Sequence, residues 1–144
     1  ESEVDGEYPA GHITGGMISE KLKNFMGEQE QEPPLFSAKF VDGKRAYELA
    51  RKKIDRKLDR VKVVFRELEL LDYTGTDASI RVVCSKGTYV RAFARDLGLA
   101  LDSGAHLRSL VRNAIGDFRL EKAITVEELI FFLENMKQSR NSFV

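Results

Sequence analysis

Residues 84–98 read Cys84-Ser85-Lys86-Gly87-Thr88-Tyr89-Val90-Arg91-Ala92-Phe93-Ala94-Arg95-Asp96-Leu97-Gly98, and this stretch decides the fold. It ends an apolar strand, turns at Gly87 and opens a helix. The strand is indicated by the alternation of Ile80, Val82 and Cys84. The helix is indicated by one apolar stripe at helical spacing, namely Val90, Phe93, Ala94, Leu97 and Leu101. We expect Thr88 to cap this helix and Gly98 to weaken it.

Further elements are predicted on both sides of this stretch. Residues 61–71 indicate a strand with Val61, Val63 and Phe65 on one face, and residues 74–77 indicate a hairpin loop. Helices are predicted at 19–26, capped by Ser19 and stopped by Gly27, at 45–51, and after a capping box at 125–128. Residues 107–113 indicate a strand or a short helical turn, and residues 115–118 a strand and turn. This irregular order favours an α+β fold, a mixed and largely antiparallel sheet with flanking helices.

The composition limits the class of protein. The chain has 144 residues, of which 42% are hydrophobic and 32% charged, as is typical of one soluble globular domain. The single cysteine, Cys84, excludes a disulfide framework and a cysteine-based zinc site, so we expect a cytoplasmic protein. His12 and His106 stand far apart, and we expect no metal. The apolar stretches are too short to cross a bilayer, and we expect no membrane partner.

The neutral net charge hides an asymmetry along the chain. Residues 1–32 carry eight acidic residues against two lysines, whereas residues 37–60 carry nine basic residues against four acidic ones. A locally basic segment is a candidate contact for a polyanion such as RNA. The alternative is a solvated helix face, because like charges on a helix often only face water.

Two polar side chains of catalytic type, Tyr89 and Arg91, stand at the junction of the strand and the helix. Rigid elements on both sides make such a junction a suitable place for reactive groups, although a tyrosine there is often structural. Arg91 lies in the first turn of an otherwise apolar helix. A buried arginine needs a carboxylate or phosphate partner, and none is evident nearby in sequence. We therefore expect its partner to come from elsewhere.

Two longer runs carry a resemblance to a known family. One is Gln31-Glu32-Pro33-Pro34-Leu35-Phe36-Ser37-Ala38, followed by Gly43-Lys44-Arg45-Ala46-Tyr47-Glu48-Leu49-Ala50-Arg51. The other is residues 84–98, followed by Ser103-Gly104-Ala105-His106-Leu107 and Leu110-Val111-Arg112. Together, over roughly residues 24–130, they resemble the bacterial tRNA pseudouridine-55 synthases, the TruB family.

The resemblance implies an isomerase that converts uridine to pseudouridine in the T-loop of tRNA. Such enzymes flip the target base into a pocket, break its glycosidic bond and rejoin the base through carbon, with an aspartate nucleophile and without a cofactor. By position, Tyr89 would contact the flipped nucleotide and assist proton transfer, and Arg91 would pair with the catalytic aspartate. Substrate binding would also involve Leu110 on the uracil face and Lys86, His106 and Arg112 on the RNA backbone.

The resemblance leaves one catalytic part outside this sequence. The family's nucleophile lies in a Gly-x-Leu-Asp-Pro motif, and this sequence contains no Asp-Pro dipeptide. We therefore expect residues 1–136 to form the C-terminal part of a catalytic domain, residues 137–144 to form a tail, and the chain to be inactive alone. Exposed strand edges of such a fragment lead us to expect self-association. Two alternatives are a non-catalytic RNA-binding module and an interaction domain whose Arg91 meets an acidic protein.

Overall fold

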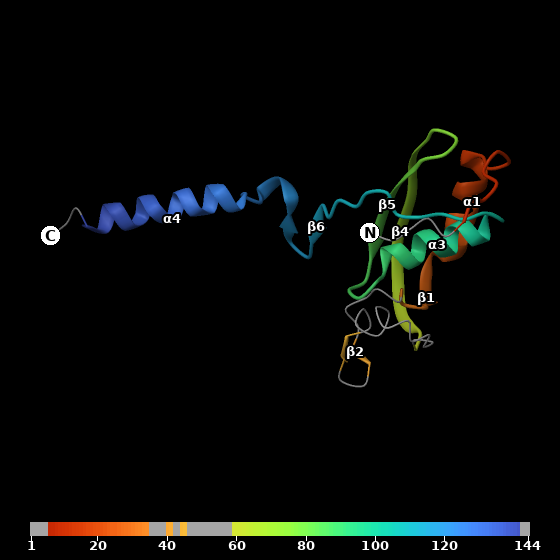
Figure 1. Ribbon diagram of the computed structural model, residues 1–144, viewed down its shortest axis with the longest axis horizontal. Coiled ribbons are helices and arrows are strands. Elements are labelled where there is room, and N and C mark those ends of the chain that lie inside the picture. Colours follow the sequence, from red (N-terminus) through yellow and green to blue (C-terminus); the bar gives the residue numbers. More distant parts are fainter. Residues whose placement is uncertain (1–5, 35–39, 42–43, 46–58, 142–144) are drawn as a thin grey trace. The chain divides into compact units, whose positions relative to one another are not determined.

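The computed structural model describes residues 6–34, 40–41, 44–45 and 59–141, and these form two units (Figure 1). One unit is Glu1–Arg108 and the other is Ser109–Val144. The first contains α1 (Gly15–Phe25), β1 (Gly27–Gln31), β2 (Phe40–Val41), β3 (Lys44–Arg45), β4 (Val61–Tyr73), β5 (Ala78–Cys84) and α3 (Val90–Ala100). The second contains β6 (Ala114–Ile115), β7 (Phe118–Arg119), the short 3-10 helix η1 (Leu120–Lys122) and α4 (Val126–Asn141). The predicted α+β class is confirmed.

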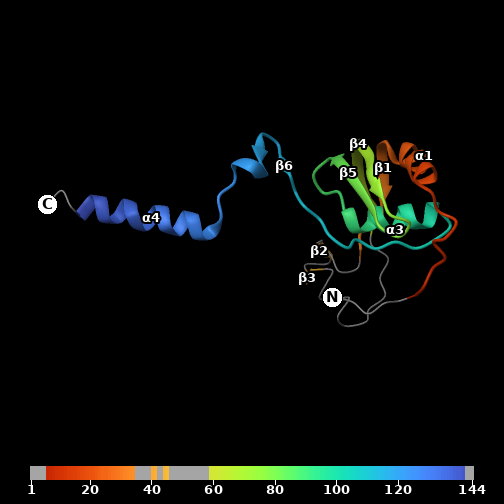
Figure 2. The ribbon, with the colours of Figure 1, turned by 90° about the horizontal axis from the view of Figure 1, so that it is seen from above.

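The main sheet of the first unit has three antiparallel strands in the order β1-β4-β5. The helices α1 and α3 lie against it (Figure 2). Strand β4 contains two irregularities in its pairing with β5, one between Phe65 and Glu67 and one between Leu70 and Asp72. They keep the apolar side chains of this long strand on its buried face. The apolar face therefore runs through Val63 and Phe65 and then through Leu68, Leu70 and Tyr73. The strand predicted at 61–71, with Val61, Val63 and Phe65 on one face, is confirmed.

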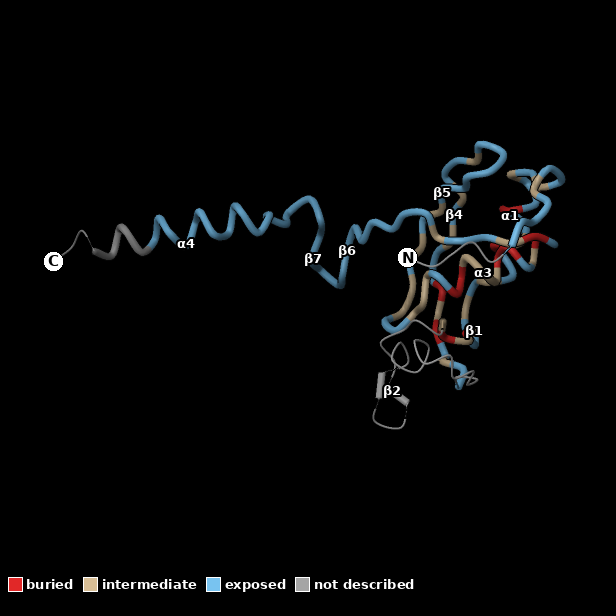
Figure 3. Tube along the Cα trace, in the orientation of Figure 1, coloured by how far each residue is buried: buried red, intermediate tan, exposed pale blue. Residues whose placement is uncertain are grey.

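The core of the first unit lies where α1, β4 and α3 meet (Figure 3). Its buried members are Ile18, Leu22, Val63, Phe65, Phe93, Leu97 and Leu101. Phe93 stands at its centre, with its ring centroid 5.1 Å from that of Phe65 and 5.5 Å from that of Phe25. The helical stripe predicted from the sequence thus supplies the α3 side of the core. Gly98 lies within α3 and is buried there.

Both predicted helix caps of the first unit are wrong. Thr14, and not Ser19, caps α1, because the Thr14 side chain accepts a hydrogen bond from the backbone N–H of Met17. At α3 the N-cap residue is Tyr89, since the Thr88 hydroxyl instead donates to the carbonyl of Ser85 at 2.8 Å. Gly27 does follow α1, with a φ of 86° that favours glycine, and it begins β1.

One strand is absent from the predictions, and two other predictions differ from the structure. Strand β1 was not predicted, because its sequence Gly-Glu-Gln-Glu-Gln has no apolar alternation. The predicted helix at 45–51 is wrong at Arg45, which lies in β3, and its other residues lie outside the described ones. Residues 107–113 form neither strand nor helix, and Leu110 and Val111 in this run are 58% and 65% exposed.

From Ala114 onward, the second unit agrees with the sequence pattern. Strands β6 and β7 pair as a hairpin around Gly116, whose φ is 56°. The capping box of α4 is confirmed: Glu128 accepts from the backbone N–H of Thr125 at 2.7 Å, and the Thr125 hydroxyl accepts from that of Glu128 at 3.1 Å. Helix α4 continues to Asn141, beyond the boundary at 136. Among the described residues, every helix is too short or too polar to traverse a bilayer.

Candidate functional site

The turn between β5 and α3 is fastened to β4 by one serine. The Ser85 backbone N–H donates to the carbonyl of Val64 at 2.8 Å, and the Ser85 hydroxyl accepts from the backbone N–H of Val64 at 2.9 Å. Gly87 completes the turn with a φ of 83°, which an L side chain rarely adopts. The candidate residues Lys86, Tyr89 and Arg91 are therefore brought together on one short, well-anchored stretch.

Tyr89 is half-buried and is the N-cap residue, immediately before α3. Its backbone is held from two sides. The backbone N–H of Tyr89 donates to Oε1 of Gln31 at 2.9 Å. The carbonyl of Tyr89 accepts from the backbone N–H of Phe93 at 3.0 Å and from Nε2 of Gln31 at 3.4 Å. The site thus has a fixed main chain from which the phenol ring projects.

Arg91 and Lys86 are both exposed. The sequence-based argument assumed that Arg91 is buried and therefore needs a carboxylate partner. That assumption is wrong, because Arg91 is exposed to water. Its neighbour Ala92 takes the buried position instead. An exposed guanidinium at a helix start remains well suited to meet an anion brought by a substrate or by another part of a protein.

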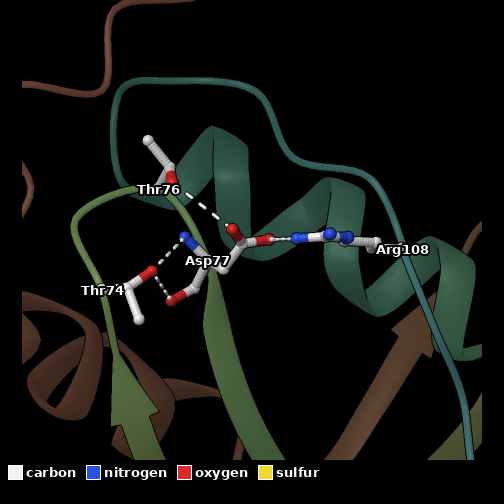
Figure 4. Close-up of polar contacts among 4 residues, drawn as sticks. All are labelled: Thr74, Thr76, Asp77 and Arg108. Atoms are coloured by element: carbon white, nitrogen blue, oxygen red, sulfur yellow. Dashed lines mark hydrogen bonds and ion pairs between the residues drawn. The ribbon is translucent and has the colours of Figure 1, made fainter.

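The segment that follows α3 is also anchored. The helix ends in a Schellman motif, in which the N–H of Asp102 donates to Leu99 and that of Ser103 to Gly98. The Ser103 hydroxyl donates to the carbonyl of Pro9 at 2.7 Å. Farther on, the Arg108 guanidinium donates to the Asp77 carboxylate in the β4–β5 turn (Figure 4). The exposed His106 lies on this tethered segment.

The remaining predicted substrate contacts belong to the other unit. Leu110 and Arg112 are exposed residues of the unit Ser109–Val144, and their predicted roles stay predictions. Most of the basic segment 37–60 lies outside the described residues. Within the described part of the chain, no three His, Cys, Asp or Glu side chains are grouped to hold a metal ion.

An open pocket of about 410 Å³ lies beside α3, lined by residues of that helix, of the end of β1 and of the segment before β4. Three acidic residues, two arginines and one leucine line it: Glu30, Glu32, Arg60, Arg95, Asp96 and Leu99. Arg95 is already engaged, because its Nε donates to the Asp96 carboxylate at 2.8 Å and its Nη2 to the carbonyl of Glu32 at 3.3 Å. The mixed charges give this pocket no clear ligand class, and Tyr89 does not line it.

Sequence reasoning missed Gln31, which only the structure links to Tyr89. Gln31 is 3% exposed although it is polar. The sequence did contain one indication of an extended backbone at this point. Gln31 lies two residues before Pro33-Pro34, and the residue before a proline favours an extended conformation. Without a predicted strand at β1, nothing indicated that its side chain turns inward.

A family model described as "TruB family pseudouridylate synthase (N terminal domain)" matches residues 1–90. A tRNA pseudouridine synthase B of Phocaeicola vulgatus is 50% identical over 137 residues, which cover 95% of this chain and 58% of that protein. One of Bacteroides thetaiotaomicron is 53% identical over 131 residues, covering 88% of this chain and 55% of that protein. A crystal structure of a Cbf5-Nop10-Gar1 complex contains a similar chain. Its TM-score is 0.70 and its identity 30%, over 92% of this chain and 37% of that one.

Proposed function

Because this chain belongs to the TruB family of pseudouridylate synthases, we propose that it is part of an enzyme that isomerises uridine to pseudouridine in tRNA. The observation that carries the proposal is identity of about half over nearly the whole chain to proteins named tRNA pseudouridine synthase B. The chain spans a little more than half the length of these relatives. The activity is therefore proposed for the protein that contains this chain together with the family's nucleophilic aspartate.

The proposed reaction conserves atoms. The bond from the ribose to N1 of uracil breaks, the base turns, and a bond from the ribose to C5 forms while the proton at C5 is lost and N1 gains one. Tyr89 would contact the flipped nucleotide and assist the proton transfer. Arg91 would pair with the aspartate, since a guanidinium can bind both oxygens of a carboxylate. The reaction needs no cofactor.

Substrate contacts extend the proposal to the T-arm of tRNA. Lys86 is exposed beside Tyr89, where an ammonium group can meet a phosphate. His106 and Arg112 would supply further backbone contacts, and Leu110 would pack on the uracil face. Residues 1–136 would belong to one catalytic domain, and the protein would act in the cytoplasm. Self-association of the isolated chain stays a prediction.

The test measures pseudouridine formation by the full-length natural protein on a T-stem-loop RNA labelled with tritium at C5 of uridine. Formation of the new bond at C5 releases the label. We expect release by the unsubstituted protein, and a fall of about a hundredfold or more in kcat for Tyr89→Phe and Arg91→Ala. Arg81→Ala is the matched control, since Arg81 is exposed on β5 and pairs with Glu69 at 2.6 Å.

The outcomes separate the proposal from its alternatives. Unchanged rates for both Tyr89→Phe and Arg91→Ala would overturn the site assignment. RNA binding without tritium release by the full-length protein would favour a non-catalytic RNA-binding module. The 144-residue chain alone is expected to bind the RNA and to release no label.

A further inference from the structure

The buried Gln31 side chain makes two hydrogen bonds to a single described residue, Tyr89, which lies 58 positions away. Oε1 of Gln31 accepts from the backbone N–H of Tyr89 at 2.9 Å, and Nε2 donates to the backbone carbonyl of Tyr89 at 3.4 Å. The side chain is 3% exposed. A side-chain amide that pairs with both the N–H and the C=O of one residue imitates the pairing of neighbouring strands.

These two hydrogen bonds, called the Gln31 clamp below, form at the N-terminus of α3, where Tyr89 supplies no side-chain cap. The N-cap residue Tyr89 makes no side-chain capping hydrogen bond. Its backbone has φ −92° and ψ 100°, an extended conformation at the point where the chain must enter a helix. Without Gln31, the Tyr89 N–H would lose its acceptor in a partly buried place, which is costly. Gln31 therefore fixes the conformation from which the Tyr89 ring projects.

A second connection joins the same strand end to α3. Nη2 of Arg95 donates to the carbonyl of Glu32 at 3.3 Å, six residues beyond Tyr89. Between these two anchors, Phe93 packs against Phe25 and Phe65 in the core. The helix can thus neither rotate about its axis nor slide along it without breaking a buried contact. Gln31 is the member of this set that touches Tyr89 itself.

From this geometry we propose that Gln31 is a positioning residue for Tyr89. The inference rests on the proposed function, because it assigns Gln31 the task of presenting the Tyr89 side chain to the flipped nucleotide. Gln31 itself would touch no substrate. Binding of the RNA backbone would depend on other residues, so loss of Gln31 should slow the reaction more than it weakens the complex.

The first test needs no activity. Amide hydrogen exchange of the full-length natural protein reports directly on the Tyr89 N–H. We expect Gln31→Met to raise its exchange rate about tenfold, since the acceptor is lost while the volume is nearly kept. The matched control is Gln29→Met on the same strand, because Gln29 instead donates to the carbonyl of Asn24 at 3.2 Å. Unchanged exchange at Tyr89 in Gln31→Met would overturn the proposal.

The second test uses the full-length protein and the tritium-release assay. We expect Gln31→Met to lower kcat about tenfold and to change KM less than twofold, with Gln29→Met near the unsubstituted protein. In a Tyr89→Ala background, Gln31→Met should have little further effect, because no ring remains to be positioned. Equal effects in both backgrounds would indicate general destabilisation and overturn the proposal.

A shorter amide guards against a folding defect in Gln31→Met. Gln31→Asn keeps the polarity but loses one methylene, so it cannot pair with both Tyr89 groups, and we expect the same fall in kcat. Full activity of Gln31→Asn would contradict the clamp. Failure of the proposed function would be seen separately, as an unsubstituted protein that releases no tritium while Gln31→Met still raises exchange at Tyr89. That outcome would overturn the proposed function, and with it the purpose of positioning Tyr89, while the contact between Gln31 and the Tyr89 main chain would stand.

Discussion

The Arg108 guanidinium lies 3.0 Å from the Asp77 carboxylate, and this ion pair joins the β4–β5 turn to the segment that leaves α3. The turn is itself ordered, because Thr74 hydrogen-bonds twice to Asp77 through its hydroxyl and the hydroxyl of Thr76 donates to the same carboxylate (Figure 4). The pair is one of the contacts that fix the position of the segment bearing His106.

This ion pair should contribute little to the free energy of unfolding. The two side chains are 77% and 51% exposed, so water and salt screen their attraction. A double-mutant cycle of Arg108→Met and Asp77→Asn in urea unfolding should give a coupling of about 0.2–1 kcal/mol that decreases in 1 M salt. A coupling well above that range would mean that the pair is shielded from solvent.

Gly98→Ala should destabilise the first unit. A Cβ added at Gly98 would clash with the backbone nitrogen of Ala105. It would also lie 2.7 Å from the carbonyl carbon of Gly104 and 2.9 Å from Cβ of Ala105. Such overpacking costs about 1–3 kcal/mol, which exceeds the helix-propensity gain of about 1 kcal/mol. Gly16→Ala in α1 is the control, because a Cβ there meets only Thr14 Oγ1 at 3.9 Å. Urea unfolding should show a loss for the first substitution and none for the second.

Asp102→Gly should stabilise the same unit. Asp102 has a φ of 53° at the Schellman turn after α3, where an L side chain is strained. Relief of about 1–2 kcal/mol, less the entropy cost of glycine of about 0.5–1 kcal/mol, leaves a gain of up to about 1.5 kcal/mol. Asp102→Ala keeps the Cβ and should not stabilise. The melting temperatures of the two variants should therefore move apart, and a lower value for Asp102→Gly would contradict this account.

The carboxyl of Glu20 should titrate below the ordinary range. A hydrogen bond from Lys23 at 2.7 Å, and the charge of that ammonium, lower the pKa of Glu20. Its stabilising contribution is present above its unfolded pKa and is lost as the pH falls through the lower folded pKa. Lys23→Met should return the pKa of Glu20 toward its usual value in a carboxyl NMR titration, whereas Lys21→Met should leave it low.

The elements that the sequence predicted best are those with strong apolar periodicity. The alternation at Val63 and Phe65 and the stripe at Phe93 and Leu97 correspond to buried faces in the structure, because burial is what selects those residues. The turn at Gly87 followed from its residue type. The site residues Tyr89 and Arg91 came from the same stretch, with a resemblance indicating their chemistry.

What could not be predicted depends on contacts between distant segments. Strand β1 forms because β4 pairs with it, which its own Glu and Gln residues do not signal. Thr88 has the chemistry of a cap, but its hydroxyl is already used within the turn. Likewise, the role of Gln31 appears only when β1 and the start of α3 are seen together.

The two irregularities of β4 also determine where residues can be inserted into or deleted from this strand. Arg66 and Leu71 are the residues that the pairing of β4 with β5 skips. Deleting either one would restore regular pairing on that strand while the apolar side chains before and after it kept their facing. A deletion between them, at Glu69 for example, would turn part of the apolar face toward water. Natural insertions and deletions in this hairpin are therefore expected to concentrate at these two positions.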